Sequence, residues 1–490
     1  MVRIEKRTEI ELIEPRQVMH WLLELTKIPR PSGHEEGVRD FLIDFAKSRG
    51  LSFETDGEKN VYITKPGQGS GKSKSPVLLQ GHMDMVCESD PGVEIDFLKD
   101  GLNVYVEDGQ LRAQGTTLGA DDGVAVACML ALLDSTELSH PPLECLFTSS
   151  EETGLYGAVA FDMTKVQARR MINMDSEEED RIVVGCCGGE RTDITFPVRR
   201  TVTGANHDAL HIALSGFCGG HSGENIAEGR ENAVKVLARV LSTLQEEHAF
   251  MLHTISGGSK DNAIPRNAEA VIVFRAPELN AIATGVREIF EQIKKEFKPC
   301  DDGAKMEIRE VHADNAWSPF MTRAVLLFLD SARNGVLQMH KDIEGLVGFS
   351  RNLGVVKDLG RQIVVTFSTR SENPYQLDYS AQELGRLAGP GKGAVKTYAR
   401  YPGWAREQTS ELRDLWKKIY LKETCREIDE VVIHAGLECG ILLDKKPDLD
   451  IISVGPDLKN VHSPSESLSL KSLETFWKVL CRVMDEIPKD

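Results

Sequence analysis

The chain has 490 residues, too many for one hydrophobic core, so two or three domains are expected. Hydrophobic residues make up 41% and charged residues 27%, as in ordinary globular proteins. Lys plus Arg number 58 against 76 Asp plus Glu, and the net charge of −18 argues against nucleic acid or an anionic membrane as a partner. No apolar run reaches the ~20 residues of a membrane helix, and the first residues carry no signal core. The cytoplasm is therefore the expected location.

Two helices are predicted near the start of the chain. Apolar residues recur at helical spacing over residues 16–27, and Pro29 ends this helix. Ser32 and Glu35 then have the spacing of a capping box, which predicts that a second helix begins there and buries residues 38–45 on one face.

His82 and Asp84 follow a short apolar strand over residues 76–80. The period of two in a strand points both side chains the same way. If His82 binds a metal through one ring nitrogen, Asp84 can accept the other N–H and fix the tautomer. Because a single His-x-Asp pair is also common as an ordinary hydrogen-bonded pair, the metal-site interpretation depends on further ligands.

Pairs of carboxylates also stand at the ends of the next predicted helix and strand. Asp121 and Asp122 precede a helix over residues 124–133 that is apolar on every side, and the positive end of a buried helix favours anions. One of the two could instead be a simple N-cap. A strand over residues 143–148 runs into Glu151 and Glu152, at the strand end where open α/β sheets place their ligands.

The same pattern returns twice more. Asp175 ends the apolar run 171–174, and His462 follows the strand 451–454. Five such side chains suit two zinc-like ions if one carboxylate bridges them. The candidate set is His82, Asp121, Glu151, Glu152, Asp175 and His462.

A long segment without candidate ligands of this kind separates Asp175 from His462. Residues 189–400 contain strands and helices in two loosely similar halves, about 205–280 and 300–385. This rhythm predicts an inserted, internally duplicated α+β domain. The remaining residues, 1–188 and 401–490, would form one domain.

The ligand motifs resemble, in order and spacing, those of the dinuclear zinc peptidase family that includes aminoacylases, carboxypeptidases, and di- and tripeptidases. They are Gly81-His82-Met83-Asp84, Gly119-Ala120-Asp121-Asp122-Gly123, Ser150-Glu151-Glu152-Thr153-Gly154, Asn173-Met174-Asp175 and His462-Ser463-Pro464. Residues 28–33, 219–223, 263–266 and 434–440 resemble the branch that cleaves unblocked dipeptides, including Xaa-His dipeptides such as carnosine.

The resemblance implies an α/β fold: a three-layer catalytic domain with a mixed sheet, and an inserted α+β lid. It implies two divalent ions, zinc first and manganese or cobalt as alternatives. Asp121 would bridge them, His82 with Asp175 would complete one site, and Glu152 with His462 the other. A carboxylate beside a metal-activated water can act as general base, the role expected of Glu151, while Asp84 orients His82.

The resemblance further implies that the lid contributes to catalysis. His221 would stabilise the oxyanion, while Asn262 and Arg370 would hold the substrate; an arginine suits its free carboxylate. His434 and Glu438 are expected to line the pocket. The ordinary interpretations are a turn residue for His221 and a lid ion pair for Arg370.

The partners implied are a small peptide substrate and a second copy of the chain, bound through the lid. Asp122 and Ser465 depart from the family pattern, where Asn and an acidic residue are common, but neither is an expected ligand. Two alternatives stay open. The same metal site could act on tripeptides or N-acyl amino acids, or the protein could be a non-catalytic binding module of the same fold.

Overall fold

The computed structural model describes residues 3–341 and 343–488, and the chain folds into two compact units. The first, here called the catalytic unit, comprises Met1–Cys186, Trp404–Val432 and Leu437–Asp490. The second, the lid unit, comprises Cys187–Gly403 and Ile433–Gly436. Each is described by itself.

The catalytic unit is built on a mixed eight-stranded sheet with the order β2-β3-β7-β4-β8-β24-β9-β23. Its four central strands, β7, β4, β8 and β24, run parallel, so their carboxyl ends meet at one edge of the sheet. The strands are β2 (Ser52–Thr55), β3 (Val61–Lys65), β4 (Val77–His82), β7 (Leu143–Thr148), β8 (Arg170–Asn173), β9 (Arg181–Cys186), β23 (Asp429–Ile433) and β24 (Asp450–Ser453).

Both faces of this sheet are covered, since Val77 and Leu79 on one face of β4 and Leu78 on the other are all buried. Five helices share one core with the first face: α2 (Arg16–Leu25), α3 (Glu36–Arg49), α4 (Ala120–Asp134), α10 (Glu411–Thr424) and α12 (Leu470–Glu486). Two shorter helices, α5 (Tyr156–Ala160) and α11 (Glu438–Lys445), pack against each other and are joined through Lys445, whose Nζ donates to the carbonyls of Ala158 and Phe161. The predicted three-layer α/β architecture is confirmed.

A smaller five-stranded sheet completes the catalytic unit, with the order β1-β5-β6-β26-β25. It joins strands from the two ends of the chain, because β6 pairs with β26. Its strands are β1 (Arg3–Ile4), β5 (Val104–Glu107), β6 (Gln110–Ala113), β25 (Leu458–Lys459) and β26 (Ser467–Ser469), and the short helix α1 (Arg7–Ile10) lies beside β5.

The capping box predicted at Ser32 and Glu35 is wrong. Helix α3 begins one residue after Glu35, and no side chain caps it. Both side chains bond elsewhere: Ser32 Oγ donates to the Asp84 carboxylate, and Glu35 accepts from the backbone N–H of Ser150. The prediction from local spacing failed because partners distant in the sequence compete for the Ser32 and Glu35 side chains.

The lid unit contains one large antiparallel sheet with the order β17-β12-β16-β14-β20-β21-β10-β22; β19 (Gly335–Met339) also pairs with β20. Its first half comprises β12 (His207–Ser215), α6 (Ala233–Glu247), β14 (Phe250–Gly257), β16 (Ala268–Arg275), α7 (Leu279–Lys294) and β17 (Lys305–Val311). Its second half comprises β10 (Gly188–Pro197), α8 (Pro319–Ser331), β20 (Val347–Asp358), β21 (Gln362–Ser371), α9 (Pro374–Ala388) and β22 (Ala394–Tyr401).

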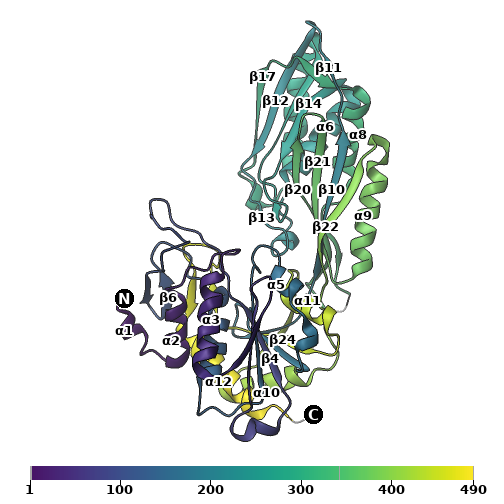
Figure 1. Ribbon diagram of the computed structural model, residues 1–490. Helices are drawn as coiled ribbons and strands as arrows, with labels where there is room; N and C mark the ends of the chain where they lie inside the picture. Colours follow the sequence, from purple (N-terminus) through teal and green to yellow (C-terminus); the bar gives the residue numbers. More distant parts are fainter. Residues whose placement is uncertain (1–2, 342, 489–490) are drawn as a thin grey trace. The chain divides into compact units, whose positions relative to one another are not determined.

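Both halves follow the same path, strand-helix-strand-strand-helix-strand, with the fourth strand beside the first and the third beside the second. They meet where Gly257 of β14 pairs with Val356 of β20, and helix α6 of the first half packs against helix α8 of the second (Figure 1). This common order supports an internal duplication. The halves are not the consecutive stretches 205–280 and 300–385, however, because the first continues to Val311 and the second begins with β10, ahead of the first.

Two short ribbons complete the lid unit. One pairs β11 (Arg200–Val202) with β18 (Asn315–Trp317), and the other pairs β13 (Gly220–His221) with β15 (Ala263–Ile264). The second ribbon sets His221 directly opposite Ala263, the residue after Asn262.

Candidate dinuclear metal centre

Asp121 lies between two histidines in the catalytic unit. Its Oδ1 is 3.0 Å from His82 Nε2, and its Oδ2 is 3.0 Å from His462 Nε2. His82 ends strand β4, Asp121 lies at the start of α4, and His462 lies in the connection between β25 and β26. One carboxylate with each oxygen directed at a different imidazole is the arrangement that a bridging ligand requires.

The remaining predicted ligands complete two groups around this carboxylate. Asp175 Oδ1 lies 3.6 Å from His82 Nε2, and Glu152 Oε1 lies 2.8 Å from His462 Nε2. Within the described residues, three sets of side chains could each hold an ion: His82, Asp121 and Asp175; Asp121, Glu152 and His462; and His82, Glu151 and Glu152. Imidazole and carboxylate donors suit zinc, manganese and cobalt, so the residues present fit two divalent ions.

The electrostatics of the cluster favour bound cations. Burial opposes ionisation of Asp121, but hydrogen bonds with His462 and His82 outweigh it and lower the pKa of this carboxyl. Burial raises the pKa of Asp175 to about 6 and that of Glu151 well above its usual range. Neighbouring carboxylates that are largely shielded from water are stabilised when positive charge lies among them.

Asp84 organises the cluster more widely than predicted. The Nδ1 of His82 lies 3.2 Å from the Asp84 carbonyl and 3.5 Å from its carboxylate. The carboxylate also accepts hydrogen bonds from the backbone N–H of Glu151 (3.1 Å) and Glu152 (3.3 Å). Asp84 therefore orients the imidazole and holds the loop that carries both glutamates.

Asp122 does not lie at the cluster as a second ligand. Its carboxyl accepts the backbone N–H of His82 (3.2 Å) and of Ala125 (3.3 Å). The bond from Ala125 is an N-cap bond, as predicted for one Asp of the pair, and the bond from His82 ties the end of β4 to the first turn of α4.

Glu438 is a fully buried residue of the catalytic unit. Its Oε2 accepts from Gln80 Nε2 (2.5 Å) and Thr148 Oγ1 (2.6 Å), near the carboxyl ends of β4 and β7. Burial raises the pKa of Glu438 to about 7, although the Thr148 hydroxyl favours the ionised form. Its predicted role in the substrate pocket stays a prediction.

The lid unit brings three of its predicted residues together around Gly223. A Cβ built on Gly223 would lie 2.8 Å from the His434 carbonyl, 3.1 Å from the His221 ring and 3.3 Å from the Arg370 guanidinium. Arg370 Nη2 is 3.3 Å from His221 Nε2, and Arg370 Nη1 donates to Tyr401 Oη. The fourth, Asn262, is half-buried beside the His221 ribbon.

His434 is neutral in this setting. Burial and the charge of Arg370 lower its pKa to about 3, and its Nε2 shares a 2.6 Å hydrogen bond with Ser350 Oγ.

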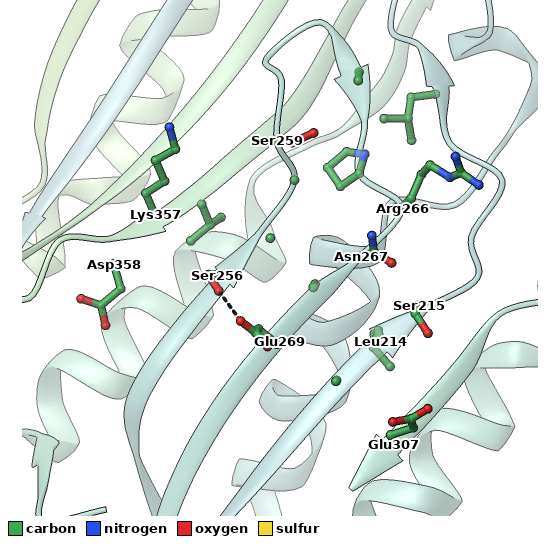
Figure 2. Close-up of a pocket in the computed structure, with 18 of the residues that line it drawn as sticks. Leu214, Ser215, Ser256, Ser259, Arg266, Asn267, Glu269, Glu307, Lys357 and Asp358 are labelled. Carbon is green, nitrogen blue, oxygen red and sulfur yellow. Dashed lines mark hydrogen bonds between the residues drawn. The ribbon is translucent and has the colours of Figure 1, made fainter. Parts of the chain in front are cut away.

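The lid unit also has an open cavity of about 1000 Å³ over β12, β14 and β16 (Figure 2). Its lining mixes the cations Arg266 and Lys357 with the carboxylates Glu269, Glu307 and Asp358, and Ser256 donates to Glu269. Because charges of both signs line it, the cavity indicates no particular class of ligand.

Two carboxylates near the cluster were not predicted from the sequence. Glu35 accepts from Ser150 N (3.1 Å), Ser150 Oγ (2.9 Å) and Lys59 Nζ (2.9 Å), so it anchors the loop before Glu151. Glu466 accepts four backbone N–H groups of residues 118–121. Glu466 lies only four residues after the candidate ligand His462, but its own partners lie far away in the sequence.

The fold and the histidine–carboxylate cluster define a dinuclear metallopeptidase. Residues 212–300 match the family model of the peptidase dimerisation domain. The chain is 33% identical over 487 residues to the cytosol non-specific dipeptidase of Escherichia coli, covering 98% of this chain and 99% of that protein. The chain therefore belongs to the M20 metallopeptidases, and among them to the family of the cytosol non-specific dipeptidase.

Solved structures agree with this family. The aminoacylhistidine dipeptidase of Vibrio alginolyticus superposes with a TM-score of 0.86 at 31% identity, covering 98% of both chains. Human carnosine dipeptidase 1 shares the fold, with a TM-score of 0.51 at 12% identity over 98% of both chains. Within residues 3–341 and 343–488, every helix is too short or too polar to span a membrane.

Proposed function

We propose that the protein hydrolyses unblocked dipeptides, Xaa-His dipeptides such as carnosine among them, in a metal-dependent reaction. The observation that carries this proposal is the Asp121 carboxylate directed at both His82 and His462, in a chain alignable over its full length with a cytosol non-specific dipeptidase. We further propose zinc as the resident ion, with manganese or cobalt as functional substitutes.

The ligands in this proposal are His82 and Asp175 for one ion, Glu152 and His462 for the other, and Asp121 for both. Bound ions would lower the pKa of a coordinated water to about 7 and polarise the peptide carbonyl. Glu151 accepts the proton of the attacking water and passes it to the leaving amine, a role suited to a half-buried carboxylate of raised pKa. Asp84 keeps His82 and the glutamate loop in place.

The lid residues have proposed roles in substrate binding. Arg370 binds the free carboxylate of the dipeptide, because a guanidinium can form two parallel hydrogen bonds with it. Asn262 holds the substrate near its carbonyl, and His221 stabilises the developing oxyanion. The proximity of His221, Arg370 and His434 supports a common role for these three.

We also propose that the protein forms a homodimer through its lid and acts in the cytoplasm. The match of residues 212–300 to a peptidase dimerisation domain supports the first, and the name of the E. coli relative supports the second. Light scattering of the purified protein would test for the dimer.

The function is tested by metal-stripped protein incubated with Ala-Ala, Gly-His, carnosine, Ala-Ala-Ala and N-acetyl-Met, with and without added Zn²⁺ or Mn²⁺. Metal-restored cleavage of the dipeptides alone is the expected result. Cleavage of only the tripeptide or the acylated amino acid would move the activity to another branch of the family. If metal binds and every substrate stays intact, the proposed dipeptidase activity is refuted and the non-catalytic alternative stands.

A further inference from the structure

One buried carboxylate holds the segment that presents Asp121. Glu466 is 2% exposed and accepts the backbone N–H groups of Leu118 (2.8 Å), Gly119 (3.0 Å), Ala120 (2.8 Å) and Asp121 (3.4 Å). Successive N–H groups directed at one anion form a rigid unit, because each bond to a charged acceptor is stronger than a neutral one.

A buried guanidinium holds the same segment from its carbonyl side. Arg30, also 2% exposed, donates through Nη2 to the Gly119 carbonyl. Its Nη1 donates to the carbonyls of Met83 (3.1 Å) and Asp84 (3.0 Å), just beyond His82. Arg30 therefore links the end of β4 to the loop before α4.

The glycines of the Gly119-Ala120-Asp121-Asp122-Gly123 motif make room for this guanidinium. A Cβ at either Gly119 or Gly123 would lie 2.6 Å from Arg30 Nη2, and Gly119 also has a φ of +65°. Any side chain at these two positions would therefore displace Arg30, and at Gly119 it would also strain the backbone.

The opposite charges of Arg30 and Glu466 are close enough to interact. Buried ion pairs contribute little net stability compared with apolar replacements, because desolvation offsets their attraction. A positional role accounts better for both: Arg30 is tied to the strand end of His82, and Glu466 lies in the segment that follows His462.

We propose that Arg30 and Glu466 act as a clamp on residues 118–121 and are positioning residues for the metal centre. The clamp keeps the two Asp121 oxygens directed at different histidines, each at 3.0 Å. The inference rests on the proposed role of Asp121 as the shared ligand. Loss of the clamp lets this carboxylate turn away from one ion.

The test compares Glu466→Gln and Arg30→Lys with the wild type. Gln is isosteric but directs an NH₂ group at N–H donors, and Lys keeps the charge of Arg but loses its fork of donors. Zn²⁺ affinity is measured by chelator competition, and the absorption spectrum of the Co²⁺-loaded protein reports ligand geometry. We expect roughly 10–100-fold weaker binding of Zn²⁺ and an altered Co²⁺ spectrum. The matched control is Glu474→Gln, at an exposed position of α12, which should behave as wild type.

Asp121→Ala separates this inference from the ligand assignment. If Asp121→Ala keeps wild-type metal affinity, the proposed centre itself is wrong. If Asp121→Ala loses metal while Glu466→Gln and Arg30→Lys bind Zn²⁺ with wild-type affinity and give the wild-type Co²⁺ spectrum, the clamp is refuted. Should Glu466→Gln fail to fold, Arg30→Lys alone decides by the same two measurements.

Discussion

Replacing Glu151 with Gln removes a proton acceptor and leaves the shape of the side chain nearly unchanged. The backbone N–H of Glu151 still donates to Asp84, so the loop keeps its anchor. A positioned general base contributes about 10²–10⁴-fold in rate, which corresponds to about 3–5 kcal/mol of transition-state stabilisation. We therefore expect kcat to fall by that factor, with KM for Ala-Ala changed little.

Metal content decides whether this interpretation is right. Glu151 could alternatively serve as a ligand, because it also lies in a possible ion-binding group with His82 and Glu152. Elemental analysis after dialysis should find two ions per chain in Glu151→Gln and fewer in His82→Ala. Equal metal loss in both variants would refute the division between base and ligand. Glu178→Gln, in the loop after Asp175, serves as the matched control for a lost surface charge.

The other predictions concern metal removal, the lid and the two cores. A chelator should lower the melting temperature, since an ion bound only by the native state at about 1,000 times its Kd contributes about 4 kcal/mol; an unchanged thermogram would contradict this. Gly223→Ala should raise KM without loss of metal, because the added methyl group would lie 2.8–3.3 Å from His434, His221 and Arg370. Leu130→Ala, in the buried helix α4, should lower the free energy of unfolding in urea by about 2–5 kcal/mol. Glu383→Ala removes the ion-pair partner of the fully buried Arg351, which then keeps, among the described residues, only its bonds to Ser380, and should cost about 3–5 kcal/mol of stability while metal content stays normal.

The grouping of the candidate ligands was predictable because most of them follow an apolar strand or open an apolar helix. Parallel strands bring such ends to one edge of a sheet, and the structure groups His82, Asp121, Glu152, Asp175 and His462 there. The two-residue spacing likewise predicted the proximity of His82 and Asp84, although β4 ends at His82. These predictions needed only short-range patterns.

The supporting residues were not predictable, for a physical reason. Glu466, Arg30 and Glu35 bind backbone groups far away in the sequence, and a backbone N–H carries no sequence signal. Ser32 and Glu35 have the spacing of a capping box, although they do not cap helix α3. The lid halves were misplaced because β17 is a charged, largely exposed edge strand, and because one half interrupts the other.

The nested order of the lid bears on how the chain assembles. Strand β10 is made first, yet its partners β21 and β22 come after the whole of β12 to β17. Closing so long a loop costs entropy that grows with its length. If the first half, β12 to β17, folds before the second, it brings the ends of the loop closer together. Strands β20, β21 and β22 can then pair beside it and with β10. The edge of β10 stays open to wrong pairing until then, and shielding it would be a task for chaperones during synthesis.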